Sequence, residues 1–154
     1  MAVRVQDVDF DITREIDTLT AGNTSIGGIA TFIGKVRAAS HGKALVSMAL
    51  EHYPGMTESE LTTIEAEATA RFRLSASLII HRVGTLKPGD NIVLVVTCSA
   101  HRHDAMQACD FLMDYLKTRA PFWKKETDTT GEGHWVDART SDDEALGRWQ
   151  TNKI

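Results

Sequence analysis

"NIVLVVTCSAHRHDAMQACDFLMDYLKTRAPFWKKE", residues 91–126, contains a strand pattern, a helix pattern and a break in close succession. The run "IVLVV" at 92–96 is apolar and of strand length. A helix is expected from about residue 102, because apolar side chains then recur at helical spacing: Ala105, Cys109, Leu112, Met113 and Leu116. Pro121 disfavours the helical conformation of the residue before it, so this helix should end near Ala120. "FWKKE" is then expected to form a strand.

The rest of the chain predicts hairpins separated by helices. Further strands are expected at 3–8, 29–36, 44–53, 77–84 and 134–138, and helices at about 12–19, at 57–72 and from Ser141. Asp11 is a candidate N-cap, and Thr57 with Glu60 and Ser141 with Glu144 match the capping box. "LKPGDN" carries turn chemistry between the strands at 77–84 and 91–98. This order predicts one α+β domain over residues 1–154, with a largely antiparallel sheet.

Composition and charge bound the class of protein. The 154 residues carry a formal net charge of -4, and 42% are hydrophobic, as in an ordinary globular domain. An acidic balance argues against bulk nucleic-acid binding, which leaves a basic footprint. Met1–Phe10 has no apolar signal sequence, and no apolar run is long enough to span a bilayer. Cys98 and Cys109 are expected as free thiols in a reducing cytoplasm.

Basic residues gather in "LKTRAPFWKKE", residues 116–126, although the chain is acidic. Lys117 falls in the last turn of the predicted helix, where a cation offsets the helix dipole. That explanation does not reach Lys124 and Lys125, which lie beyond Pro121 beside aromatic residues. Neighbours on a strand point to opposite faces, so only one of these two lysines should share a pocket with Lys117. The segment therefore indicates either a solvated helix end or an anion-binding or catalytic pocket.

Two other segments could bind an anion. "SAHRHDA" precedes the predicted helix, where free N–H groups and His101, Arg102 and His103 could bind a phosphate. Loop polarity is the equally weighted alternative. Lys35 and Arg37 of "GKVR" lie two residues apart and project to one face, which is either solvated or a second anion contact. No CxxC, HExxH or acidic cluster at ligand spacing is present, so no metal is expected. These patterns predict an anionic ligand without identifying a reaction.

Five segments together resemble the large, catalytic subunit of molybdopterin synthase. They are "ATFIGKVR", "LEHYPGMTE", "IIHRVGTLKPGD", "SAHRHDAMQACDFLMDYLKTRAPFWKKE" and "HWVDAR", in order between about residues 29 and 139. The resemblance implies an α+β fold with an α/β-hammerhead element and a homodimer that binds two small ubiquitin-like subunits, giving a heterotetramer. The small subunit carries a Gly-Gly thiocarboxylate. Its sulfur goes to cyclic pyranopterin monophosphate to form the dithiolene of molybdopterin, without a cofactor on this chain.

The resemblance also implies a role for individual residues. Lys117 and Lys124 would be the catalytic lysines, and Lys125 would be structural or peripheral. Arg37, His101 and Arg102 would bind the substrate, some of them across a dimer interface. Phe32 and Met113 would line the channel for the partner's tail. Two alternatives are a non-catalytic module that grips a ubiquitin-like tail and a binding protein or hydrolase for another phosphorylated metabolite.

Overall fold

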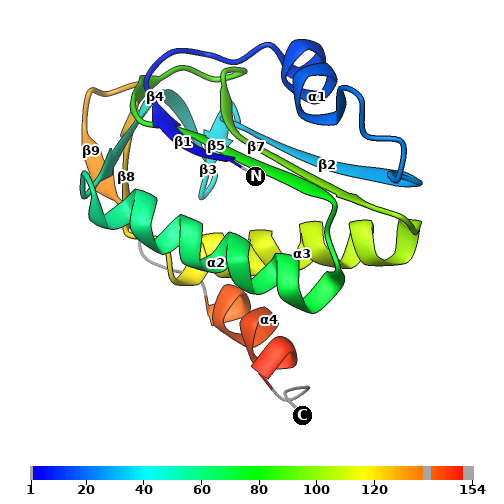
Figure 1. The fold of residues 1–154 in the computed structure, drawn as a ribbon. Helices are drawn as coiled ribbons and strands as arrows, with labels where there is room; N and C mark the ends of the chain where they lie inside the picture. Colours follow the sequence, from blue (N-terminus) through cyan, green and yellow to red (C-terminus); the bar gives the residue numbers. More distant parts are fainter. Residues whose placement is uncertain (1, 137–139, 151–154) are drawn as a thin grey trace.

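The computed structural model describes residues 2–136 and 140–150, apart from the side chains of 140–142 and 148. The chain forms two β-sheets flanked by helices, and nearly all strand pairs are antiparallel (Figure 1). The predicted α+β class is therefore confirmed. Within the described residues, no helix is both long and apolar enough to cross a membrane.

The first sheet is built around the apolar strand that opens the quoted stretch. Its strand order is β1-β5-β7-β2, with β1 (Ala2–Gln6), β5 (Ala76–Arg82), β7 (Asn91–Ser99) and β2 (Gly28–Lys35). β5 and β7 are buried along most of their length because helices cover both faces of the sheet. Among the described strands, β1 and β5 form the one parallel pair, and β1 and β2 are the two edge strands of this sheet.

Two long helices cover one face of this sheet, and a short one covers the other (Figure 1). α2 (Met56–Phe72) and α3 (Arg102–Thr118) pack on one side, and α1 (Ile12–Thr20) lies on the opposite side. The C-terminal α4 (Thr140–Gln150) packs beside α3, where Trp149 makes edge contacts with the rings of Phe72 and Phe111. Phe111 is 1% exposed, so this aromatic cluster belongs to the main core.

The second sheet stands beside the first and contains the strand that follows the proline break. Its members are β3 (Ala39–Ser40), β4 (Lys43–His52), β6 (Gly84–Leu86), β8 (Phe122–Asp128) and β9 (Gly133–Trp135). β4 pairs along most of its length with β8, and β6 pairs with the same strand, β4. The chain between β5 and β7 thus crosses to the second sheet and returns, which joins the two sheets.

The structure corrects several details of the predicted elements. The strands at 77–84 and 91–98 pair as expected, but residues 84–86 form a separate strand in the other sheet, and β3 was not predicted. Asp11 does cap α1, accepting a hydrogen bond from the Arg14 N–H. The capping box of Thr57 with Glu60 is wrong, because the Glu58 carboxylate accepts the N–H of Gly55 instead. The predicted box at Ser141 depends on a side chain that is not described, and residues 137–138 of the last predicted strand lie outside the described residues.

Candidate active site

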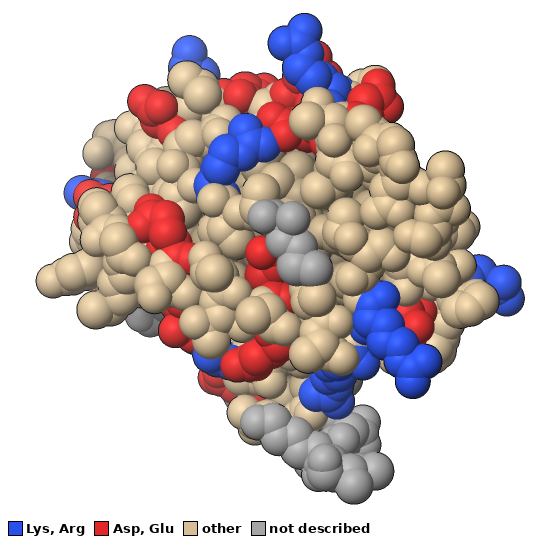
Figure 2. All heavy atoms as spheres, viewed as in Figure 1, with Lys and Arg blue, Asp and Glu red and all other residues tan. Residues whose placement is uncertain are grey.

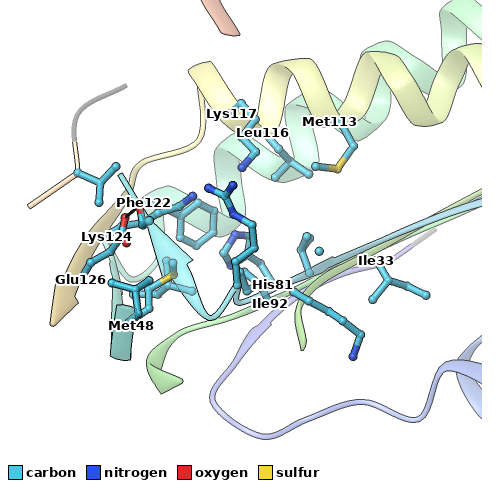
Figure 3. A pocket seen from close by; sticks show the side chains of 18 of the residues that line it. Ile33, Met48, His81, Ile92, Met113, Leu116, Lys117, Phe122, Lys124 and Glu126 are labelled. Carbon is cyan, nitrogen blue, oxygen red and sulfur yellow. Dashed lines mark hydrogen bonds between the residues drawn. The ribbon is translucent and has the colours of Figure 1, made fainter. Parts of the chain in front are cut away.

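A pocket of about 500 Å³ lies where the two sheets meet the C-terminal end of α3 (Figure 3). Five of the seven residues predicted for the site line it: Phe32, Arg37, Met113, Lys117 and Lys124. They come from β2 and the segment that follows it, from α3 and from β8. Figure 3 shows Lys117 reaching from the helix and Lys124 from the strand toward one space. The pocket therefore brings together groups that are far apart in the sequence.

The turn between α3 and β8 is fixed to α2 by polar contacts. The Thr57 hydroxyl donates to the Pro121 carbonyl at 3.3 Å and accepts the Tyr53 N–H at 3.0 Å. Arg119 Nε donates to Glu60 at 2.9 Å, and its guanidinium also pairs with Glu67. Arg119 is thus held on the α2 side and does not line the pocket. This arrangement sets the angle between the helix that carries Lys117 and the strand that carries Lys124.

The alternation along β8 separates the neighbouring lysines, as the sequence predicted. Lys124 lines the pocket together with Phe122 and Glu126, two residues before and after it. Lys125 is exposed on the other face, where its Nζ lies 5.8 Å from the centre of the Trp135 ring. Lys125 therefore contributes nothing to the pocket lining.

Lys35 and Arg37 both line the pocket, so the anion contact is the better of the two interpretations for "GKVR". A register shift in the β2–β7 pairing occurs between Gly34 and Lys35. Lys35 Nζ also donates to the Gly89 carbonyl at 3.3 Å. The lining thus holds cations from three segments of the chain, and such fixed charges favour an anionic ligand or transition state.

His81 is a lining residue that the sequence reasoning missed. Its ring stacks on Phe122 with centroids 3.7 Å apart, and Nδ1 lies 2.8 Å from the Arg82 carbonyl. The carbonyl can only accept, so Nδ1 carries the proton and Nε2 is left as an acceptor. Burial, with the charges of Lys124 and Lys117, lowers the pKa of His81 from 6.5 to about 4. The ring is therefore neutral at neutral pH. The only signal in the sequence is a polar residue within an apolar strand.

Glu126 was also missed, and within the described part of the chain it is the only acidic residue that lines the pocket. It is 7% exposed and accepts a hydrogen bond at Oε1 from the Ser40 hydroxyl at 3.1 Å. Its other oxygen, Oε2, has no hydrogen-bond partner among the described residues. Strand alternation could have predicted it, because Glu126 lies two residues after Lys124 and so shares its face of β8.

His101 and Arg102 are not in the pocket of this chain. Both are exposed at the start of α3, and Lys117 is near its end. Fifteen residues of α-helix separate Arg102 from Lys117, which corresponds to about 22 Å. A single protomer therefore does not assemble all the predicted substrate contacts.

The described part of the structure offers one group of possible metal ligands. Asp128, Glu132 and His134 place ligand atoms within 4.8 Å of one another. Asp128 Oδ1 already accepts hydrogen bonds from Thr130 and from the Glu132 N–H, and Glu132 and His134 are exposed. This arrangement is that of a capped turn, and neither His101 nor His103 belongs to such a group.

Comparisons with known proteins agree over nearly the whole chain. The model of the family described as "MoaE protein" matches residues 5–119. The molybdopterin synthase catalytic subunit of Ralstonia nicotianae is 53% identical over 147 residues, which cover 96% of this chain and 83% of that protein. The catalytic subunit from Pseudomonas aeruginosa is 51% identical, with 97% and 99% covered.

Solved structures give the same result. The molybdopterin biosynthesis MoaE protein from Burkholderia ambifaria superposes with a TM-score of 0.83 at 52% identity, covering 97% of this chain and 99% of that one. A crystal structure of molybdopterin synthase from Staphylococcus aureus superposes with a TM-score of 0.80 at 26% identity, covering 87% and 96%. The chain therefore belongs to the MoaE family of molybdopterin synthase catalytic subunits.

Proposed function

We propose that this chain is the sulfurtransferase subunit of a molybdopterin synthase. It would transfer sulfur from the C-terminal thiocarboxylate of a small ubiquitin-like subunit to cyclic pyranopterin monophosphate, forming the dithiolene of molybdopterin. The observation that carries the proposal is the pocket that Lys117 and Lys124 enter from different elements, with Arg37 at the same cavity. No single helix end or strand would gather these cations.

The chemistry needs what the pocket contains. The donor and the phosphate of the acceptor are both anions, and sulfur transfer passes through further anionic species. The lysine and arginine side chains stabilise that charge in a partly dry cavity. In each of the two transfers a C–S bond replaces a C–O bond of the pterin substrate, whose oxygen leaves as water or as a freed phosphate oxygen. The acyl–sulfur bond of the donor is hydrolysed, which leaves the tail as a carboxylate. Lys117 or Lys124 can supply and accept the protons of these steps. The sulfur arrives on the partner, so no cysteine of this chain takes part.

The apolar part of the lining suits an extended Gly-Gly tail. Phe32 and Met113 lie at the cavity with Leu116, which is buried on the same helix as Lys117. Phe32 is 41% exposed and so stands at the entrance. A tail that enters past these side chains brings its terminal sulfur to the lysines.

A second copy of the chain would supply His101 and Arg102. β2 is an edge strand of its sheet, with Ile29 and Phe32 exposed along it. The start of β2 lies against the start of α3, since a Cβ added to Gly28 would be 3.1 Å from the Arg102 Cα. The other end of β2 reaches the pocket. A two-fold axis through the middle of β2 would place His101 and Arg102 of one protomer beside the pocket of the other.

We also infer a cytoplasmic location, because both cysteines are free thiols in the structure.

Reconstitution tests the proposal. The purified chain is mixed with a thiocarboxylated small subunit and cyclic pyranopterin monophosphate, and the dithiolene product is measured. Lys117→Ala should abolish product and leave small-subunit affinity near that of the parent, and Lys125→Ala, as matched control, should change neither. Equal losses of affinity and product in Lys117→Ala would favour the tail-binding module. Phosphorylated-metabolite turnover without any thiocarboxylated partner would favour the hydrolase.

A further inference from the structure

The carboxylate of Glu126 is a buried group that sulfur transfer does not explain. It lies among the cations of the pocket, and Oε2 has no hydrogen-bond partner among the described residues. A buried acceptor without a donor is costly, and a charged one especially so. No described residue fills this acceptor, so a donor that enters the cavity can do so.

Ser40 holds this carboxylate in place. Its hydroxyl donates to Oε1 at 3.1 Å, and both side chains are at least nine-tenths buried. β8 fixes the backbone of Glu126 through its pairing with Met48 on β4 and His134 on β9. Figure 3 shows Glu126 on the same strand as Lys124, beside Met48 at the cavity wall. The acceptor is therefore part of a rigid wall.

The cationic side chains cannot recognise every part of the proposed substrate. Lysine and arginine only donate hydrogen bonds, so they suit the phosphate. A pterin also presents two adjacent donors, the N3–H and the 2-amino group, and a carboxylate accepts such a pair. Glu126 is the only carboxylate among the described residues of the lining. We infer that Glu126 is a specificity-determining residue whose carboxylate accepts the amino-pyrimidinone edge of the pterin. The inference rests on the proposed function for the identity of the ligand.

A matched pair of ligands tests this role without any sulfur donor. Phosphorylated 6-hydroxymethylpterin has the 2-amino group, and phosphorylated 6-hydroxymethyllumazine has an oxo group in its place. Binding of both to the full chain is measured by ligand fluorescence. The parent protein should bind the pterin about tenfold to hundredfold more tightly, which is the range for a hydrogen bond to a charged group.

Glu126→Gln should remove or reverse this preference. The Oε1 of the new glutamine can still accept a hydrogen bond from Ser40, but an N–H donor replaces Oε2. That donor cannot accept a hydrogen bond from the 2-amino group of the pterin, and it can donate one to the oxo group of the lumazine. Unchanged or tighter binding of the lumazine compound would show that the pocket of the variant is folded. Lys125→Gln, one residue away on the opposite face, is the control and should keep the full preference for the pterin. Ser40→Ala should weaken the preference partly, because the carboxylate loses its anchor.

Equal affinity of the parent protein for the two ligands, including no measurable affinity for either, would overturn the inference. A full preference for the pterin in Glu126→Gln would also overturn it, since the carboxylate would then not be the group that recognises the amino group of the ligand. Failure of the proposed function is distinguishable, because reconstitution would give no dithiolene even when the ligand preference and its dependence on Glu126 are intact.

Discussion

His81 should make the stability of this protein fall between pH 7 and pH 5. The imidazole is buried against Phe122, beside the charges of Lys124, Lys117 and His52, and its pKa is lowered from 6.5 to about 4. Burial is the largest cause, and the hydrogen bond to the Arg82 carbonyl opposes it only in part. Between these two values the unfolded chain binds a proton that the folded chain does not. The stabilising effect is thus complete above the unfolded pKa and is lost as the pH falls toward the folded one.

The size of the effect follows from the two pKa values. Protonation of the unfolded state alone lowers the free energy of unfolding by about 2 kcal/mol from pH 7 to pH 5, and by about 3 kcal/mol at pH 4. Other shifted groups act differently. The raised pKa of Glu65, caused mainly by burial, works in the opposite direction. The lowered pKa values of Asp9 and Asp128 act below their ordinary value of 3.8.

Urea unfolding of the parent protein and of His81→Gln at pH 7 and pH 5 isolates the contribution of the histidine. The variant lacks the titrating group, so its loss between the two pH values should be smaller by about 2 kcal/mol. Contributions from the carboxylates are common to both proteins and cancel. The m-values should agree, which shows that the same transition is compared. An identical pH dependence in the two proteins would refute the reasoning, because His81 would then titrate equally in the folded and unfolded states.

Three further predictions concern the frame of the pocket. Thr57→Val should lower the free energy of unfolding by about 1–3 kcal/mol in a urea titration, because the Tyr53 N–H and the Pro121 carbonyl lose their partner. Thr63→Val on the exposed face of α2 is the control, and equal losses in the two variants would contradict the role given to the Thr57 hydroxyl. Gly27→Ala should sharply lower the melting temperature, since its Cβ would lie 2.0 Å from the Ala100 carbonyl oxygen. In the control Gly147→Ala, in α4, the added Cβ meets nothing within 4 Å, so the melting temperature should stay the same or rise. Cys98 and Cys109 should react with a disulfide reagent at pH 8 only when the protein unfolds, because burial raises the pKa of Cys98 and raises that of Cys109 to about 11. Rapid labelling of the native protein would disprove this protection.

The sequence predicted the elements that depend on local pattern. The periodicity from Ala105 to Leu116 and the break at Pro121 located α3 and β8 closely, and strand alternation correctly separated Lys124 from Lys125. These inferences succeed because helical spacing, proline sterics and the pleat act within a few residues. The composition of "GKVR" left two interpretations open, and only the fold showed that both cations reach the cavity.

Features that depend on contacts between distant segments were missed. Residues 84–86 form a strand because β4 offers a free edge beside them, which no local pattern reveals. α2 begins at Met56, and Thr57 is instead used to hold Pro121 in place. Nothing in the local pattern distinguishes His81 or Glu126 from other strand residues, because their neighbours in the cavity come from other elements. Their roles follow from the environment in which the fold places them.

The length of α3 has a genetic consequence in the proposed dimer. One end of this helix carries Lys117 for its own pocket, and the other carries Arg102 for the pocket of its partner, about 22 Å away. A protomer with Lys117→Ala and a protomer with Arg102→Ala would combine both defects in one pocket of a mixed dimer and leave the other pocket intact. Two inactive alleles could thus complement each other when they are expressed together.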